Sequence, residues 1–164
     1  MANLCLAALE TLRGFMLAPD GVNSDLGAIA IRDEVICPEL KDRQILLWHV
    51  PAPLADSNEP LDYPTLYLYC DRMDNRLERK FRAFSGPIFI VAEIRFSAPS
   101  FEELEQRTNQ YVEAVTSVLG RHLGKWTDSV AFNGAYEVQF QPVEAGGLGF
   151  LQRAEIAVEL QAHA

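Results

Sequence analysis

Cysteine is scarce in this chain of 164 residues, which has only Cys5, Cys37 and Cys70. The three are far apart in the sequence, and none forms a Cys-x-x-Cys pair or a Cys/His pair with the spacing of metal ligands. A free cysteine away from such a pattern usually packs as a small apolar side chain. We therefore expect buried free thiols, and neither a metal ligand nor a redox role.

Long apolar runs are also missing. The longest runs, such as residues 87–92, fall well short of the roughly 18 apolar residues that cross a bilayer. The first residues, MANLCL, lack the basic segment and the cleavage site of a secretory signal. We expect a protein that is made in the cytoplasm of its cell and has no membrane partner.

Basic residues are outnumbered, with 14 Lys and Arg against 23 Asp and Glu, which gives a net charge of −9. Binding to phosphate groups requires a surplus of basic side chains. The composition therefore argues against direct, sequence-specific binding of nucleic acid.

Motifs that carry catalysis are absent as well. No Gly-x-Ser-x-Gly elbow nominates a nucleophile, although a Ser/His/Asp triad assembled in space stays open. The stretch AGGLGF lacks the GKS or GKT ending of a phosphate loop and lies between two strand patterns, which favours a hairpin turn. None of His49, His122 and His163 lies at a metal-binding offset from another ligand, so capping or surface roles are expected. We expect no enzyme, no cofactor and no metal site.

Periodicity predicts three helices. Residues 4–17 have an apolar stripe, and residues 26–36 could form a second helix capped by Asn23-Ser24-Asp25, with a strand as the rival prediction. The clearest helix spans residues 100–123. Ser100 and Glu103 have the spacing of a capping box, and Glu102, Glu103 and Glu105 suit the positive end of the helix dipole. Its predicted buried stripe is Phe101, Leu104, Thr108, Tyr111, Val112, Val115, Val118 and Leu119.

Alternation predicts strands at residues 44–50, 65–70, 88–96, 135–143 and 153–161. In residues 88–96 the apolar side chains share one face, while Glu93 and Arg95 point to the other. Together the patterns predict a single α+β domain over residues 1–164, with a mostly antiparallel sheet packed against two or three helices. Residues 51–64 are expected to form an exposed loop, and residues 71–87 a charged hairpin that turns at Ser85-Gly86-Pro87.

Basic residues are concentrated in one segment. Residues 72–82 hold five of the 14 basic residues and two acidic ones, so this segment carries +3 and the rest of the chain −12. Segregated charge suits copies that must meet in one orientation. The alternative is a solvated hairpin edge whose charges prevent aggregation. The candidate interface residues are Arg72, Arg76, Arg79, Lys80 and Arg82.

The order of these elements resembles the tail terminator, or tail-completion, proteins of long-tailed bacteriophages. The resemblance covers residues 4–160. Its strongest points are YPTLYLY at 63–69, IFIVAEIRF at 88–96, the helix 100–123, which carries YVEAVTSVL, and RAEIAVELQ at 153–161. Residues 20–60 are longer than the family pattern needs, and a head-tail connector or another neck protein would share the same order.

The resemblance implies a structural virion protein with a small α+β fold and no catalytic residues. Such proteins form a six-fold ring on the tail tube, end its polymerisation and join the tail to the head. The implied partners are other copies of the chain, the tail tube protein and head-tail connector or neck proteins. The implied location is the tail or neck of the virion, after synthesis in the host bacterial cytoplasm.

One function of another class stays open. A small-molecule enzyme or binding module would need a pocket between the sheet and helix 100–123, near Tyr111 and Trp126.

Overall fold

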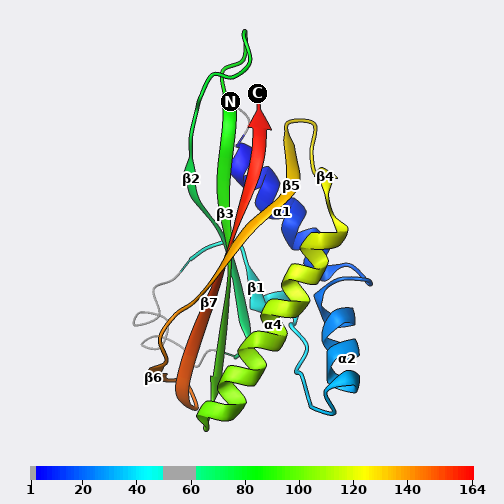
Figure 1. Cartoon of the computed structure of the whole chain (residues 1–164), viewed down its shortest axis with the longest axis vertical. Coiled ribbons are helices and arrows are strands. Elements are labelled where there is room, and N and C mark those ends of the chain that lie inside the picture. Colours follow the sequence, from blue (N-terminus) through cyan, green and yellow to red (C-terminus); the bar gives the residue numbers. More distant parts are fainter. Residues whose placement is uncertain (1–2, 50–61) are drawn as a thin grey trace.

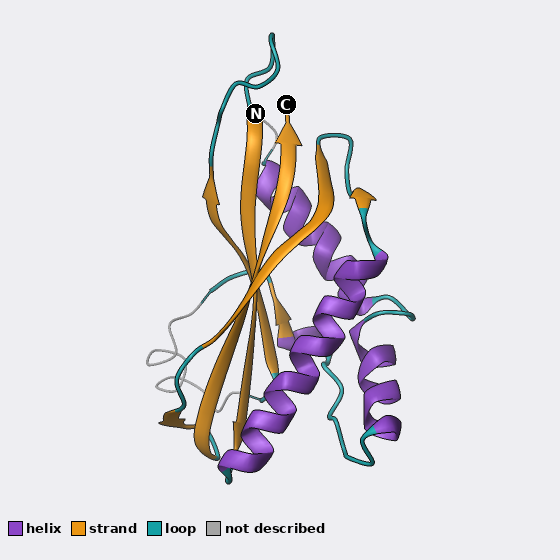
Figure 2. Cartoon of the chain, in the orientation of Figure 1, coloured by secondary structure: helices purple, strands orange, loops and turns teal. Residues whose placement is uncertain are grey.

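In the computed structural model, which describes residues 3–49 and 62–164, three α-helices cover one face of a seven-stranded sheet (Figures 1 and 2). The strand order is β1-β2-β3-β7-β5-β4, and the short β6 pairs with β7. All described pairs are antiparallel except β1 with β2. The predicted α+β domain with a mostly antiparallel sheet is confirmed.

The first two helices are α1 (Leu4–Leu17) and α2 (Val22–Arg32). α1 agrees with its predicted span, and Asn3 Oδ1 accepts a hydrogen bond of 3.1 Å from the Leu6 amide. The helix prediction is right for α2, but its bounds were wrong, because α2 starts after Gly21 and ends at Arg32. A Cβ on Gly21 would lie 2.3 Å from the Met16 carbonyl oxygen, so this close chain reversal requires glycine.

The long helix α4 (Phe101–Arg121) begins as predicted, since Ser100 Oγ accepts a hydrogen bond of 3.3 Å from the Glu103 amide. Its predicted stripe is buried from Leu104 to Leu119. Phe101 is the exception, with 60% of its surface exposed, and it stacks on Phe150 with 4.2 Å between ring centroids.

The described strands are β1 (Ile45–Leu46), β2 (Thr65–Met73), β3 (Ser85–Ala98), β4 (Gly124–Lys125), β5 (Val130–Phe140), β6 (Glu144–Gly146) and β7 (Gly149–His163). The predicted strand at 44–50 is reduced to two residues, and the end of that prediction together with most of the predicted loop 51–64 lies outside the described residues. The predicted AGGLGF turn joins β6 to β7, with Gly146 opposite Gly149.

The core lies between the sheet and the helices. Ile88, Ile90, Ala92 and Ile94 of β3 are fully buried there, against side chains of α1 and α4. Glu93 and Arg95 lie on the opposite face, as predicted, but both are also fully buried, which the alternation did not predict. They form an ion pair, and the Arg95 guanidinium lies 4.3 Å from the centre of the Tyr67 ring. Alternation assigns a side chain to a face and carries no information about what covers that face.

Candidate interaction surface

A long loop, residues 74–84, joins β2 to β3 at one end of the molecule (Figure 1). The β2–β3 pairing continues into its base, because the Asp74 amide donates to the Pro87 carbonyl and the Arg76 amide to the Ser85 carbonyl, each at 3.0 Å. Ser85, Gly86 and Pro87 are therefore in β3, and the predicted turn at these three residues was wrong. The chain reverses nearer to residue 80.

Asn75 holds the two arms of the loop together. Its Oδ1 accepts hydrogen bonds from the Ser85 amide at 3.1 Å and the Leu77 amide at 3.3 Å, and its Nδ2 donates to the Ala83 carbonyl at 3.0 Å. An asparagine side chain commonly stabilises a turn in this way. The loop therefore has a defined base from which the tip projects.

The tip exposes two large apolar side chains. Leu77 is 64% exposed and Phe81 is completely exposed, at 103% of its reference surface. Both have positive φ angles, 50° for Leu77 and 65° for Phe81, in a region that bulky residues rarely occupy. Exposed aromatic side chains on a projecting loop are typical of protein interfaces. Neither residue was predicted as part of an interface. The feature of the sequence that marks them is their apolar character within an otherwise charged segment.

The five predicted interface residues all lie in this hairpin, in two different environments. Arg72 lies over Phe89, with its guanidinium carbon 4.1 Å from the ring centre, and Arg76 Nε is 2.8 Å from Asp74 Oδ2. The hydrogen bond to Asp74 raises the pKa of Arg76 above its ordinary value. Within the described chain, Arg79, Lys80 and Arg82 have no carboxylate within ion-pair distance. The loop tip therefore carries three unpaired cations.

These cations act on a nearby histidine. His163 is at the end of β7, next to Ser85 in the sheet register. Desolvation first, and then the positive charges of Arg79 and Arg82, lower the pKa of His163 below its ordinary value. The shift favours the neutral form of His163.

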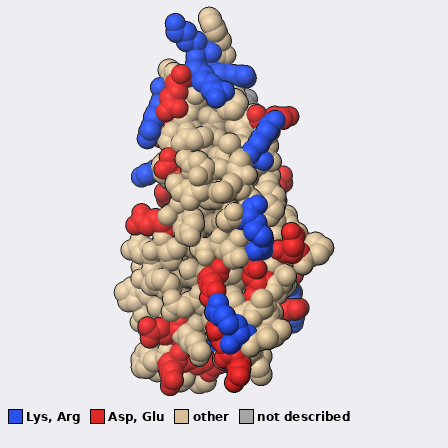
Figure 3. All heavy atoms as spheres, turned by 45° about the vertical axis from the view of Figure 1, so that its right-hand side comes forward, with Lys and Arg blue, Asp and Glu red and all other residues tan. Residues whose placement is uncertain are grey.

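The surface charge is divided between the two ends of the molecule (Figure 3). Blue side chains gather at the end that holds the 74–84 loop, and red side chains gather at the other end. The start of α4 lies at the acidic end (Figure 1), where Glu102, Glu103 and Glu105 are exposed. The charge segregation along the sequence is thus also a segregation in space.

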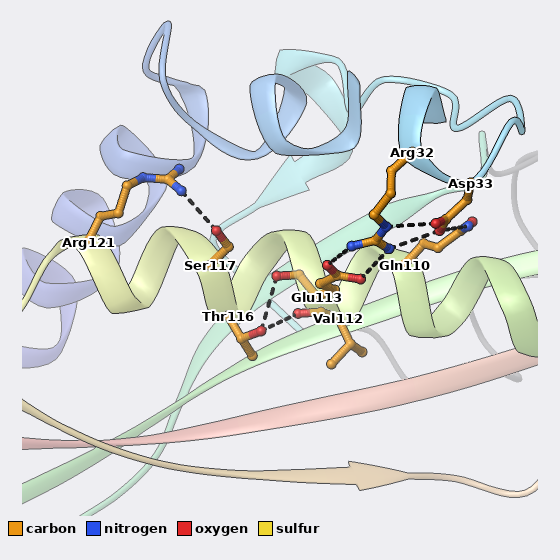
Figure 4. Close-up of polar contacts among 8 residues, drawn as sticks. All are labelled: Arg32, Asp33, Gln110, Val112, Glu113, Thr116, Ser117 and Arg121. Atoms are coloured by element: carbon orange, nitrogen blue, oxygen red, sulfur yellow. Dashed lines mark hydrogen bonds and ion pairs between the residues drawn. The ribbon is translucent and has the colours of Figure 1, made fainter. Parts of the chain in front are cut away.

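A second polar cluster joins α2 to α4 (Figure 4). Arg32 forms ion pairs with Asp33 and Glu113, and Gln110 Nε2 donates to Asp33 Oδ2 at 2.8 Å. Hydrogen bonds from Arg32 and then Gln110 lower the pKa of Asp33 to about 2. A hollow of about 170 Å³ beside this cluster is lined by Arg32 and Glu113 together with other residues of α2 and α4, namely Asp25, Ala28, Ile29 and Ser117. The cluster is accounted for as a contact between two helices.

A pocket was expected near Tyr111 and Trp126. Both residues are instead packed side chains of the core. Tyr111 is fully buried and its hydroxyl donates to the Pro38 carbonyl, and burial raises the pKa of that hydroxyl. Trp126 is 9% exposed, packs on Phe132 with 5.5 Å between ring centroids, and donates from Nε1 to the His122 carbonyl.

Histidine and cysteine side chains have structural contacts. His122 caps the end of α4 and stacks on Phe15 with 3.7 Å between ring centroids, and His49 Nε2 lies 3.3 Å from Glu93 Oε2. Cys5 is buried, whereas Cys37 and Cys70 are half-buried, and all three are free thiols.

Across residues 3–49 and 62–164, no three His, Cys, Asp or Glu side chains are grouped so that they could hold a metal ion. No helix in these ranges has the length and apolarity to cross a membrane.

No family model and no curated protein matches this chain. Among solved structures, a chain from a particle described as the virion of a native gene transfer agent is 14% identical, with a TM-score of 0.38. The match covers 87% of this chain and 92% of that chain. A likeness at this level assigns neither a family nor a function, so a functional interpretation has to come from the chain's own residues.

Proposed function

We propose that this protein is a non-enzymatic structural component of a long-tailed, phage-like virion. In this proposal it is a tail terminator: a ring, hexameric as in the family that the sequence resembles, that caps the tail tube and ends its polymerisation. The same ring joins the tail to the head through connector or neck proteins. Its location is the tail or neck of the virion.

The observation that carries the proposal is the loop 74–84, with three unpaired cations and two exposed apolar side chains at one end of a molecule whose other end is acidic. A solvated edge accounts for exposed cations. It does not account for the two large apolar side chains, Leu77 and Phe81, that are exposed together on this loop and whose burial by a partner is favourable.

A ring also requires two different surfaces on each copy. In a head-to-tail ring, one patch of a subunit contacts a different patch of the next, and the ring closes if the relation between neighbours is a pure rotation. Opposite charges on the two patches guide the copies into this orientation and disfavour contacts between like patches. The basic loop tip supplies one of the two patches. Its acidic counterpart in a closed ring has to lie at a similar height on the molecule, because a contact between opposite ends gives an open filament.

The proposal is tested by electron microscopy of tails assembled in cells that lack this gene. The account predicts tails of uncontrolled length that do not join to heads, and restored length when the wild-type gene is supplied. Tails of normal length that join to heads in the deletion strain would contradict it. The neighbouring genes offer an independent check, because the proposal predicts portal, capsid, tube and tape-measure genes beside this one.

A further inference from the structure

A groove of about 310 Å³ lies beside the loop, on the sheet face that is turned away from the helices. Phe89 of β3 and Glu159 of β7 are register partners there, as are Ala157 of β7 and Glu137 of β5. These residues alternate along their strands with the buried core residues, which places them on the outer face. The groove is therefore built on rigid strands.

The groove combines one aromatic side chain with an acidic rim. Phe89 is half-buried and lines it, with the Arg72 guanidinium 4.1 Å from the centre of its ring. Tyr136 also lines it, but the register partner of Tyr136 is the core residue Val158, so the Tyr136 side chain belongs to the helix side of the sheet. Asp71, Glu137 and Glu159 also line it, and in the described part of the chain none of these carboxylates has a basic nitrogen within ion-pair distance. The groove thus complements the loop tip mainly in charge, with three unpaired carboxylates for its cations and the Phe89 side chain for an apolar contact.

We propose that this groove receives the 74–84 loop of a second copy of the chain. Phe81 of one copy packs against Phe89 of the next, and Arg79, Lys80 and Arg82 pair with the carboxylates of the rim. The contact leaves no exposed aromatic side chain at the tip and neutralises charges that each copy alone leaves unpaired. This inference rests on the proposed ring and names the surface that closes it.

The position of the groove favours a ring over a filament. Asp71 and Arg72 line the groove and belong to the end of β2 that runs into the loop, whereas Ala157 pairs with Val91 near the middle of β3, so the groove extends from the middle of the sheet towards the loop. Copies joined through loop and groove are shifted along the molecule by less than copies joined end to end. If the loop instead docked on the acidic end around Glu102 and Glu105, each copy would be shifted by most of the length of the molecule, and the assembly would be an open filament.

The test uses two charge-reversal variants, R79E/R82E in the loop and E137K/E159K in the groove. Native mass spectrometry and electron microscopy then follow the full-length proteins over a concentration series. Each variant alone is expected to stay monomeric at concentrations at which the wild type forms rings. An equal mixture is expected to form rings again, because a reversed loop pairs with a reversed groove and a normal loop with a normal groove. Such rings alternate the two variants, so their subunit number is even.

Two further variants separate the possible contacts. Phe81→Ser removes the aromatic anchor and is expected to weaken assembly by at least about tenfold, a loss typical of a buried interface aromatic. Mixing Phe81→Ser with E137K/E159K is not expected to restore rings. The matched control is E102K/E105K, which reverses two exposed carboxylates at the acidic end and is expected to form rings like the wild type. Circular dichroism checks that each variant is folded.

The outcomes distinguish this inference from the function on which it rests. Rings from the mixture, but from neither variant alone, support it. If the wild type forms rings and the mixture does not, the groove is not the receiving surface and this inference is overturned, while the proposed function stands. Loss of assembly in E102K/E105K, with assembly retained in E137K/E159K, would overturn it in favour of the acidic end. A wild type that never forms rings, alone or on tail tubes, would overturn both.

Discussion

At the scale of single residues, the most unexpected feature is the buried ion pair of Glu93 and Arg95. Both side chains have no exposed surface, and His49 and Tyr69 also contact Glu93. A buried charge is costly unless it is paired, so removing one partner costs far more than replacing both. The pair therefore holds its two side chains in one arrangement on the outer face of the sheet.

Replacing Arg95 by methionine tests this interpretation. The variant keeps most of the side-chain volume but leaves Glu93 buried without its cation, so we expect a loss of about 3–5 kcal/mol in the free energy of unfolding. Urea denaturation measures this value. Arg153→Met is the matched control, because Arg153 pairs with Glu144 at the surface and should cost no more than about 1 kcal/mol. An equal loss in the two variants would contradict the interpretation.

Gly86 allows the two arms of the hairpin to pack closely at the base of the 74–84 loop. A Cβ at this position would lie 2.1 Å from the Asp74 carbonyl oxygen, so Gly86→Ala must displace the opposite arm of the hairpin. We expect a loss of about 1–3 kcal/mol, as in other overpacked sites, together with faster tryptic cleavage within residues 76–82. Gly14→Ala is the control, since nothing lies within 4 Å of its added Cβ and alanine favours helix. Unchanged cleavage in Gly86→Ala would show that the loop base tolerates a side chain.

At the scale of elements, the contacts of Arg32 with Asp33 and Glu113 join α2 to α4 through charged groups at the surface. Asp33 has a folded-state pKa of about 2, below its ordinary value of 3.8. A carboxyl whose pKa is lowered by folding stabilises the protein above its unfolded-state pKa and loses that contribution as the pH falls through the folded-state pKa. The contribution is thus present at neutral pH and lost between about pH 4 and pH 2.

Asp33→Asn is expected to lower the urea midpoint at pH 7 and to approach the wild-type midpoint as the pH falls from 4 to 2. The difference at pH 7 should also shrink in 1 M salt, because these groups are at the surface and are screened. The measurement is the unfolding midpoint of both proteins across this pH range. A difference that stays constant down to pH 2 would indicate that the substitution acts through packing and not through charge.

The elements differ in how far their sequence predicts them. α4 is predicted to within two residues at each end, because a side-chain cap marks its start and a long apolar period runs along it. β3 is identified by its alternation, but it begins three residues earlier and ends two residues later than predicted. The start of α2 was missed because the chain reversal before it depends on the close packing of Gly21 against the Met16 carbonyl oxygen. Helix periodicity does not show such a contact. The strand expected at 44–50 shortens to Ile45–Leu46 for a similar reason, since only these residues find a partner strand in β2. Local patterns cannot encode such contacts.

For the same reason, only part of the proposed interaction surface has a signal in the sequence. Charge clustering nominates Arg72, Arg76, Arg79, Lys80 and Arg82, which the structure places in one hairpin; their role in an interface stays a prediction. The exposure of Phe81 and Leu77, and the groove formed by β2, β3, β5 and β7, depend on how distant segments come together. Neither has a signature in a linear pattern.

At the scale of the whole molecule, the protein has two ends of unlike charge and a loop that projects from the basic end. Residues 74–83 of the loop are exposed and only Phe84 at its end belongs to the core, which supports charge reversal within residues 74–83 as a test that leaves the fold intact. Arg76 has 53% of its side chain exposed, and Arg79 has no ion-pair partner among the described residues. Both can be replaced without disturbing the core.

The most direct measurement is sedimentation velocity of the wild type and of R76E/R79E over the same concentration range, with and without tail tubes as template. The account predicts rings for the wild type, and a folded monomer with an unchanged circular dichroism spectrum for the variant. K41E is the control for loss of a surface cation away from the loop. Rings of normal size from R76E/R79E would contradict the central claim that the basic loop closes the assembly.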